Sequence, residues 1–511
     1  MFGKVYGAAI YGVDSVPVTV EADVSDGLPS FDMVGVLSSE VKEARERVRT
    51  ALKNSGFRIP PKRITINLSP ADMRKSGAGF DFPIAAAVLG ALGLVPNDLL
   101  VHCMFCGELG LDGRLYSVPG VLPAAFTARK KGLRWIVVPQ GNLEEAQLVE
   151  GIQAAGLRSL EEAADWLRHP GPMAGTVGFH ACREPEAEWD FCDVNGQQTV
   201  KRAAEISAAG MHHLLCVGPP GAGKTMIARR LPGILPPMDE EEKLEVTRIY
   251  SVCGLLKDHG RLIQNRPFRA PHHTISAAAL IGGGSIPRPG EITLAHRGVL
   301  FLDELPEFSR ASLESLRQPL EEKEIVVSRL QKTCRFPADF LLCAAMNPCK
   351  CGYYPDRNQC ACTFHSVRQY RDKVSRPLLD RLDLIVEVAC LDYDDWRADQ
   401  EAESSAAIRK RVEAAHRIQS RRFQGLSIRF NGQMSGSQVK QFCALGREEE
   451  GFLKDVCRKM RLTPRSWNRI LKVARTVADL DGGERIQAAH LSEAVFYRSA
   501  VEKYWGVEER Y

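Results

Sequence analysis

The chain has 511 residues, enough for about three domains of ~150 residues each, which excludes a mini-protein or a simple adaptor. Its 67 basic side chains nearly balance the 63 acidic ones, for a net charge of +4, so any surface that binds nucleic acid must be local. A hydrophobic fraction of 44% and a charged fraction of 25% are ordinary for globular proteins and exclude collagen, coiled-coil rods and wholesale disorder.

The sequence contains no segment of the kind that spans a membrane. The longest apolar stretch, Phe82 to Val95, is shorter than the ~20 residues needed. Asp14 interrupts the region where a secretion signal needs unbroken apolar residues. The 15 cysteines are odd in number and scattered, which argues against a disulfide framework. We therefore expect a soluble cytoplasmic protein with no membrane partner.

The first part of the chain has the pattern of a mixed domain. Apolar residues alternate with polar ones from Val16 to Val24, the period of a half-buried strand. Behind the possible caps Ser38 and Ser39, a helix is predicted because five apolar residues follow at helical spacing: Val41, Ala44, Val48, Ala51 and Leu52. The other predicted elements are strands at 63–68 and 135–139 and a helix at 82–94. We predict an α+β or α/β domain over 1–167.

Residues 168–189 separate this domain from a second unit. They contain His169-Pro170-Gly171-Pro172 and lack periodicity, which is typical of a linker. A second α/β unit is predicted over 190–393, and a mostly helical part over 394–511.

A phosphate-binding loop is predicted in the second unit. The apolar run Leu214 to Val217 precedes GPPGAGKT and a helix-compatible segment, the order of strand, glycine loop and helix that such loops require. The loop comprises Gly218, Pro219, Pro220, Gly221, Ala222, Gly223, Lys224 and Thr225. Its backbone N–H groups and Lys224 suit the phosphates of ATP, and the Thr225 hydroxyl suits Mg²⁺. The alternative, a glycine turn without a ligand, is rare in this context.

Two acidic residues follow the apolar run that begins at Val299, where a strand is expected to end. Asp303 can hold Mg²⁺ through water, and Glu304 can polarise the attacking water. An apolar run followed by two acidic residues, taken alone, usually marks only the point where a strand reaches solvent. Its occurrence after a phosphate loop favours the functional interpretation.

Four more polar residues are candidates for the same site. Asn347 ends a strand predicted over 340–346, where it can bond the γ-phosphate or the attacking water, although asparagine is also a common turn former. Arg381 precedes another strand, and Arg465 and Arg469 lie four apart on one helix face. Taken alone, each arginine is an ordinary solvated charge.

Four cysteines are grouped as two CxC pairs: Cys349, Cys351, Cys360 and Cys362. Four thiolates at this spacing can enclose one tetrahedral Zn²⁺. The alternative is a set of redox-active or plain thiols. Cys103 and Cys106 are interpreted as core residues. The cluster directly follows Asn347, so a bound metal would hold that strand end.

Long motifs show a resemblance to a known family. They are FRAPHHTISAAALIGGGSIPRPGEITLAHRGVLFLDELPEF, DFCDVNGQQTVKRAAEISAAG before the phosphate loop, and LLDRLDL after it. Over nearly its full length the chain closely resembles the ComM/YifB family, AAA+ ATPases similar to the magnesium chelatase ATPase subunit and related to the MCM helicases. The resemblance implies an α/β fold with an AAA+ P-loop ATPase core, an amino-terminal Lon-protease-like α+β domain and a helical carboxy-terminal lid.

The resemblance also implies roles for single residues. Asn347 becomes the sensor-one residue, Arg381 the arginine finger and Arg465 the sensor-two arginine. Such a finger enters the neighbouring subunit's site, so hydrolysis implies a homo-oligomeric ring, usually a hexamer. Where the family reads SGPLLDR this chain has Arg376, which is a second candidate for the finger. Pro464 also departs from the family pattern and is tolerable only in a helix's first turn.

The amino-terminal segments ADMRKSGAGFDFPIAAAVLGALGLVP and GELGLDGRLYSVPGVLPAAFTARKKGLRWIVVP resemble the Lon-type peptidase domain, whose chemistry needs a serine and a lysine. Here Gly79 stands at the nucleophile position and Pro119 at the lysine position, so a non-catalytic scaffold is expected. Ser76 beside Lys75 is only an accidental pair, because adjacent residues in a turn point apart. Either nucleic-acid contact or ordinary surface charge fits the basic residues Arg74, Lys75, Arg129, Lys130 and Lys131.

By resemblance, the predicted function is an ATP-driven ring motor on branched or single-stranded DNA, with branch-migration or helicase activity in the recombination of transforming DNA. The predicted channel contacts are Arg266, Arg269 and Arg288. One alternative is a chelatase-type motor that drives metal insertion into a porphyrin. A second is an ATP-dependent protease, which Gly79 and Pro119 oppose.

Overall fold

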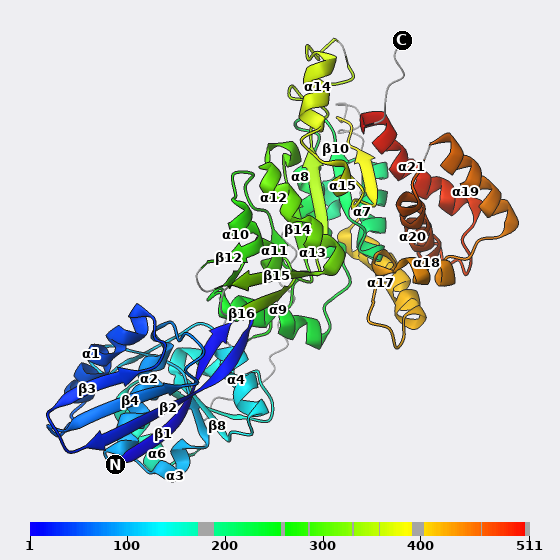
Figure 1. The fold of residues 1–511 in the computed structure, drawn as a ribbon. Helices are drawn as coiled ribbons and strands as arrows, with labels where there is room; N and C mark the ends of the chain where they lie inside the picture. Colours follow the sequence, from blue (N-terminus) through cyan, green and yellow to red (C-terminus); the bar gives the residue numbers. More distant parts are fainter. Residues whose placement is uncertain are drawn as a thin grey trace.

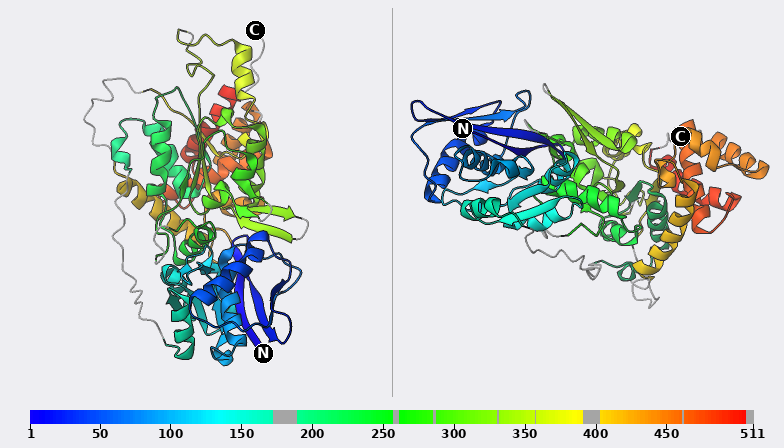
Figure 2. Two further views of the ribbon diagram at one scale, coloured as in Figure 1. Left: turned by 90° about the vertical axis from the view of Figure 1, so that its left-hand side faces the viewer. Right: turned by 90° about the horizontal axis from the view of Figure 1, so that it is seen from below.

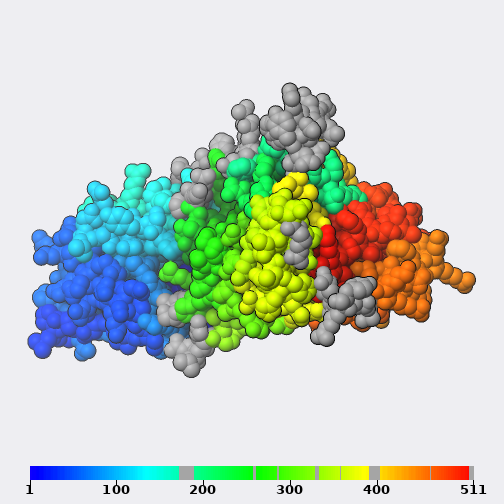
Figure 3. All heavy atoms as spheres, turned by 90° about the horizontal axis from the view of Figure 1, so that it is seen from above, coloured from blue at the N-terminus to red at the C-terminus, as the bar shows by residue number. Residues whose placement is uncertain are grey.

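The computed structural model of the chain describes residues 1–171, 189–256, 261–284, 287–329, 332–356, 358–390, 403–460 and 462–505. Figures 1 and 2 show three parts in succession, an amino-terminal sheet domain, a central domain and a helical carboxy-terminal part. The space-filling view in Figure 3 has the same order, from blue through green to red. Most of the predicted linker, and the start of the predicted helical part, lie outside the described residues.

The amino-terminal domain is built on a mixed seven-stranded sheet in the order β3-β4-β2-β1-β5-β8-β9. Its strands are β1 (Phe2–Tyr11), β2 (Asp14–Ser25), β3 (Ser30–Val34), β4 (Arg63–Ser69), β5 (Cys103–Phe105), β8 (Trp135–Pro139) and β9 (Gln153–Leu157). Around it lie α1 (Ser39–Asn54), α2 (Asp81–Ala91), α3 (Asn97–Leu100), α4 (Val121–Lys130), α5 (Leu143–Gln147), α6 (Leu160–Arg168) and the hairpin of β6 (Glu108–Leu109) and β7 (Leu115–Tyr116).

Local sequence signals account for the helices of this domain. All five predicted core positions of α1 are buried, and the Ser38 side chain accepts a hydrogen bond from the Val41 N–H at 3.4 Å. Every residue of α2 is buried, as its continuous apolar sequence requires. α2 ends at Ala91 rather than at Leu94, because Gly93 turns the chain with a φ of +70°.

The central domain is built on a parallel five-stranded sheet in the order β11-β14-β17-β10-β18. The strands are β10 (Leu214–Val217), β11 (Phe268–Arg269), β14 (Val299–Leu302), β17 (Leu341–Met346) and β18 (Leu384–Glu387). Leu214 and Cys216 pack in one buried cluster, and Leu215 and Val217 pack in another. Both faces of the sheet are therefore covered, as a parallel sheet requires.

The helices of the central domain are α7 (Gln198–Gly210), α8 (Lys224–Ile234), α9 (Glu240–Val252), α10 (Ala277–Ile281), α11 (Glu291–Leu294), α12 (Arg310–Ser315), α13 (Arg317–Glu322), α14 (Phe364–Arg371) and α15 (Arg376–Leu379). Two hairpins extend from it: β12 (Gly282–Gly283) with β13 (Arg288–Pro289), and β15 (Glu324–Arg329) with β16 (Lys332–Pro337).

The carboxy-terminal part consists of α17 (Ser405–Arg422), α18 (Gly436–Phe442), α19 (Arg447–Lys459), α20 (Pro464–Leu480) and α21 (Ala488–Trp505). Pro464 is the first residue of α20, so the prediction that it lies in a first turn is confirmed. α21 packs beside β18 and α20. Among the helices that the structure describes, none combines the length and the apolar character needed to cross a membrane.

The amino-terminal domain packs directly against α9 of the central domain. Gly120 N–H donates to the Ser251 carbonyl at 3.0 Å, and the Ser251 hydroxyl donates to a buried Glu145 oxygen at 2.5 Å. Arg248 on α9 pairs with Asp14, N to O, at 3.1 Å. These contacts hold α4, α5 and the turn between β1 and β2 on one helix of the central domain.

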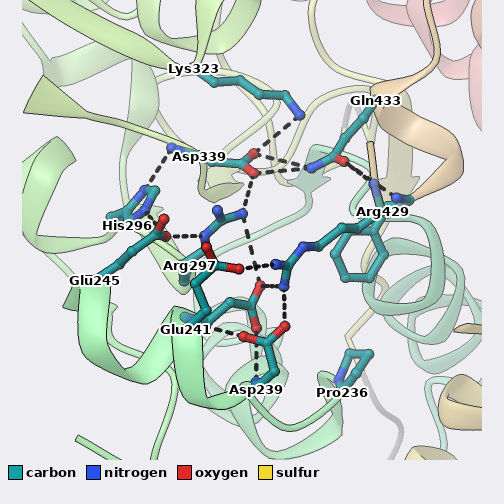
Figure 4. Close-up of polar contacts among 12 residues, drawn as sticks. Pro236, Asp239, Glu241, Glu245, His296, Arg297, Lys323, Asp339, Arg429 and Gln433 are labelled. Atoms are coloured by element: carbon teal, nitrogen blue, oxygen red, sulfur yellow. Dashed lines mark hydrogen bonds and ion pairs between the residues drawn. The ribbon is translucent and has the colours of Figure 1, made fainter. Parts of the chain in front are cut away.

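A largely buried ion-pair network joins α9 to the sheet and to the helical part (Figure 4). The Arg297 guanidinium pairs with Glu245 at 3.0 Å and with Asp339 at 2.8 Å. From the helical part, the Gln433 amide donates to Asp339 at 3.1 Å, and Arg429 pairs with carboxylates at the start of α9. The network thereby attaches the helical part to the central domain.

His296 completes this network as a neutral ring. Burial lowers the pKa of His296. Its Nδ1 accepts from the Asp339 N–H at 3.0 Å, and its Nε2 lies 3.1 Å from a Glu245 oxygen, to which it donates. Burial alone would raise the pKa of Glu245, but His296 and Arg297 lower it to about 2. Glu245 is thus ionised at neutral pH.

Arg297→Met should destabilise the central domain by about 3 kcal/mol, because it removes the cation that pairs with both the Glu245 and the Asp339 carboxylate. Urea unfolding followed by tryptophan fluorescence measures the change. Arg368→Met is the control, since the Arg368–Asp372 pair is exposed, with 72% and 62% of the side-chain surfaces accessible. Equal urea midpoints for the two variants would contradict a contribution of the network to stability.

Candidate nucleotide site

Three predicted polar signals meet at one edge of the central sheet. β14, β17 and β10 are parallel neighbours, so their carboxyl ends lie together. The phosphate loop follows β10, Asp303 and Glu304 follow β14, and Asn347 follows β17. The structure therefore brings together segments that are far apart in the sequence.

The phosphate loop curls through two left-handed glycines, Gly221 with a φ of +78° and Gly223 with a φ of +87°, directly before α8 begins at Lys224. The Lys224 Nζ donates to the Gly218 carbonyl at 2.8 Å and to Asn347 Oδ1 at 3.1 Å. Burial lowers the pKa of Lys224. This geometry aims a cation and the amino end of a helix at the same space, which suits a polyphosphate.

The residues predicted to hold Mg²⁺ touch one another. The Thr225 hydroxyl donates to Asp303 Oδ2 at 2.9 Å. A hydroxyl and a carboxylate are oxygen ligands of the kind that Mg²⁺ takes beside nucleotide phosphates. These two residues therefore fit the cofactor that the phosphate loop requires.

Glu304 has an unusual backbone and a partner that sequence reasoning missed. Its φ of +51° is rare for a residue with a side chain. Its carboxylate lies 3.2 Å from His273 Nδ1. The His273 ring centroid lies 4.1 Å from that of His272, with the two planes tilted by 34°, and the His273 ring lies edge-on to Phe308. The available signal was topological: His273 follows β11, the neighbour of β14 in the sheet.

Arg381 is held inside its own chain. Its side chain is 8% exposed, its Nη2 lies 2.6 Å from the Glu321 carboxylate, and it donates to the carbonyls of Arg317 and Pro377. Arg376, the second candidate for the finger, is exposed and donates to the Trp505 carbonyl at 3.3 Å. A trans role for Arg381 requires that it leave Glu321.

The two arginines of α20 differ in environment. Arg469 pairs with the buried Asp383 at 2.8 Å, and His212 Nδ1 lies 3.2 Å from the other Asp383 oxygen. Burial would raise the pKa of Asp383, but Arg469 and His212 hold it well below its usual range. Arg465 is exposed, and no ion pair holds it among the residues that the structure describes.

The four grouped cysteines come together beside this site. Their sulfur atoms all lie within 4.8 Å of one another, and Cys349 and Cys360 are buried. The backbone N–H of Tyr353 lowers the pKa of Cys351 to about 7. The set has the ligand number and type of a structural zinc site.

The prediction of channel contacts is wrong for Arg266 and stays a prediction for Arg269. Arg266 is 5% exposed, donates to backbone carbonyls and pairs with the buried Glu242 at 3.2 Å. Arg269 is half-buried and makes a two-pronged ion pair with Glu291 at 2.7 and 2.8 Å. The Arg266 charge therefore lies in the core of the central domain, whereas the Arg269–Glu291 pair is partly exposed. Arg288 is exposed on the β12–β13 hairpin and stays a prediction.

In the amino-terminal domain, both interpretations of Lys75, as a nucleic-acid contact and as an ordinary surface charge, are wrong. Its side chain is fully buried, its Nζ donates to the Pro70 carbonyl, and burial lowers its pKa. A Cβ built on Gly79 would lie 4.0 Å from the Val118 side chain, next to Pro119, so the two Lon-type positions lie close together without a serine or a lysine. The other basic residues are exposed: Arg74, Arg129, Lys130 and Lys131.

Three family models match successive parts of the chain. Residues 190–396 match the model of magnesium chelatase, subunit ChlI. Residues 20–142 match a model described as subunit ChlI of Mg-chelatase, and residues 402–498 match the carboxy-terminal model of that subunit. The matched segments correspond to the sheet domain, the central domain and the helical part.

Relatives match almost the whole chain. It is 42% identical to the protein YifB of Salmonella typhimurium, over 97% of this chain and 96% of that protein. It is 41% identical to the competence protein ComM of Haemophilus influenzae, over 97% of both. A stretch covering 32% of the chain is 25% identical to Lon protease 2 of Bacillus subtilis, over 32% of that protein. These findings confirm the predicted fold, a magnesium-chelatase-like AAA+ core with an amino-terminal Lon-like domain.

Proposed function

The chain belongs to the ComM/YifB family, with a magnesium-chelatase-like AAA+ core, and we propose that it is an ATP-hydrolysing ring motor that acts on DNA. The observation that carries the ATPase proposal is the pair of contacts at one sheet edge, Lys224 to Asn347 at 3.1 Å and Thr225 to Asp303 at 2.9 Å. They join all three strand ends of a phosphate-binding sheet into one polar site.

In the proposed reaction, water attacks the γ-phosphorus while the bond to the β,γ-bridging oxygen breaks. Lys224 neutralises charge that builds up on the phosphate oxygens, and Asn347 orients the γ-phosphate or the water without adding negative charge. Glu304 accepts a hydrogen bond from the water and polarises it. Bound Mg²⁺, held by Thr225 and Asp303, supplies Lewis-acid stabilisation of the phosphate charge.

An arginine supplied by a neighbouring subunit would stabilise charge on the leaving phosphate, which is the reason to propose assembly into a ring. Arg381, or Arg376 five residues before it, is proposed to enter the neighbouring subunit's site, and Arg465 is proposed as the sensor-two arginine. Because each site then needs a neighbour, ATP should favour a closed homo-oligomer, which we propose to be a hexamer.

The DNA part of the proposal is supported by the name of one relative, a competence protein. Competence concerns the uptake of DNA, so we propose branch migration or unwinding of branched or single-stranded DNA during recombination of transforming DNA. A ring repeats the exposed Arg288 around one axis, which concentrates positive charge in a chain whose net charge is only +4.

A second candidate is a chelatase-type motor that drives metal insertion into a porphyrin. It is favoured by the matches of three chain segments to magnesium chelatase models. Dependence of ATP turnover on a porphyrin-binding partner, without any response to DNA, would establish it. Proteolysis has no such support, because Gly79 and Pro119 replace the serine and the lysine that the Lon-type reaction needs.

Glu304→Gln should reduce the kcat for ATP by about 100-fold or more, through loss of water activation, while nucleotide affinity stays within a few fold. His273→Ala should reduce kcat by about tenfold, because Glu304 loses the group that orients it. The double variant should be no slower than Glu304→Gln alone, since both changes act through one carboxylate. Additive losses, or wild-type turnover in His273→Ala, would contradict the proposed positioning.

Arg381→Ala should lower kcat by about 10³-fold if Arg381 is the finger. Mixing it with Lys224→Ala subunits should restore part of the turnover, because the finger acts on a neighbour. Thermal unfolding checks that the variant folds, since Arg381 is buried. A larger loss in Arg376→Ala would transfer the role to Arg376.

Forked or four-way DNA should raise ATP turnover, and an increase in salt from about 50 to 200 mM should remove most of the effect. Arg288→Ser should weaken this response and leave basal turnover unchanged. The matched control is Arg368→Ser, which removes an exposed arginine from α14. If no DNA changes the rate and gel shifts at low salt show no binding, the chelatase-type candidate takes the place of the DNA motor.

A further inference from the structure

The four-cysteine cluster has the dimensions of a site for one metal ion. Its sulfur–sulfur distances are 3.3 Å for Cys349 to Cys351, 3.5 Å for Cys351 to Cys360 and 3.8 Å for Cys349 to Cys360. A zinc ion with four bonds of ~2.3 Å has thiolates ~3.8 Å apart, whereas a disulfide needs ~2.05 Å. The described distances therefore fit a tetrahedral ion and do not fit disulfides.

The polypeptide around the cluster also supports thiolate ligands. The N–H groups of Gly352 and Tyr354 donate to the Cys349 sulfur at 3.3 and 3.4 Å. Such outer hydrogen bonds stabilise negative charge on a ligand and fix its direction. Cys349 is fully buried, so a metal ion is the partner that would stabilise a thiolate at this position.

The segment that carries the four cysteines, described over 349–356 and 358–362, is called the cluster loop, and it lies directly on the phosphate loop. A Cβ built on Gly352 would come within 2.3 Å of Pro220 Cδ, and Gly352 has a left-handed φ of +92°. Only glycine allows the backbone to approach Pro220 so closely in this conformation. The position of the cluster loop therefore limits where Pro220 can lie.

The same loop starts from the strand end that carries Asn347. Pro348 separates Asn347 from Cys349, and its carbonyl accepts a hydrogen bond from Arg371 Nε at 2.9 Å. The Arg371 guanidinium lies over the rings of Tyr354, within the cluster loop, and Tyr504, at 4.6 and 4.9 Å from the ring centroids. The first part of the loop is thereby fixed at two points, beside Asn347 and against Pro220.

We propose that the four cysteines bind one zinc ion and that the zinc-bound loop positions the nucleotide site, through Gly352 on Pro220 and through Pro348 on Asn347. Loss of zinc releases the cluster loop. Pro220 of the phosphate loop and Asn347 at the end of β17 are then no longer held in position. The inference rests on the proposed nucleotide site and adds a metal requirement to it. Zinc takes no part in the chemistry of ATP hydrolysis, because its four ligands leave no open position.

The first experiment measures metal and nucleotide together. Full-length protein purified without chelator should contain one zinc per chain by elemental analysis, and Cys362→Ser should contain less than half of that. Removal of zinc by a chelator should raise the Kd for a fluorescent ATP analogue by about tenfold, and added Zn²⁺, but not Mg²⁺, should restore it. Absence of zinc in the wild type, or an unchanged Kd after its removal, would overturn the proposal.

The second experiment separates the contact from the metal. Gly352→Ala keeps all four cysteines, so zinc should stay at one per chain while the Kd for the analogue rises about tenfold, because the new methyl group displaces Pro220. Adding Pro220→Ala removes the atoms that clash and should recover part of the affinity. Gly425→Ala is the matched control, with a left-handed φ of +81° and no atom within 4 Å of its built Cβ.

A Gly352→Ala variant that binds the analogue as tightly as Gly425→Ala would overturn the coupling between the two loops. The proposed nucleotide site is tested apart from this by Lys224→Ala, which should lose the analogue with zinc still bound. If Lys224→Ala binds the analogue like the wild type, the nucleotide site itself is wrong. Failure of the motor and failure of the metal coupling are therefore distinguishable.

Discussion

The hydrogen-bonded register of three parallel strands determines the geometry of the whole site. Val217 of β10 pairs with Met346 of β17, and Leu302 of β14 pairs with Ala344 of the same strand. The pairing continues into the phosphate loop, where the Gly218 N–H donates to the Met346 carbonyl at 3.2 Å. A slip by one residue would turn the side chains of β17 to the opposite faces of the sheet and separate Asn347 from Lys224.

Burial of the partner decides which arginines are structural and which can change position. Asp383 is buried, so removing Arg469 from it would leave an uncompensated carboxylate in the core, and that ion pair is structural. Glu321 is 55% exposed, so water can replace Arg381 at this carboxylate with little loss. This difference suits Arg381, and not Arg469, to a role that requires movement to a neighbour.

The Lon-like amino-terminal domain makes contacts with two elements of the central domain. Val13, in the turn between β1 and β2, packs in the same buried cluster as Phe336 of the β15–β16 hairpin, and Glu145 accepts from Ser251 on α9. Two elements of the central domain, the hairpin and α9, thus pack on the Lon-like domain.

The sequence by itself determined the features that depend on short stretches of chain. The core face of α1 follows from a period of 3.6, Pro464 at the start of α20 follows from its missing N–H, and the phosphate loop follows from glycines beside Lys224 and Thr225. The strand ends at Asp303 and Asn347 could also be predicted, because apolar runs stop there. Asp303 and Asn347 lie at the same edge of the sheet because β14 and β17 are parallel neighbours.

The tertiary structure alone decided which charges are buried and which distant residues touch. The sequence predicted Arg266 and Lys75 as surface charges, but both are buried. The groups that accept from Arg266 come from distant segments, whereas Lys75 donates to the nearby Pro70 carbonyl. His273 reaches Glu304, and Gly352 reaches Pro220, only through the order of strands in the sheet and the path of the cluster loop. Periodicity and motif spacing report on neighbours along the chain, whereas these contacts depend on how separate elements pack in space.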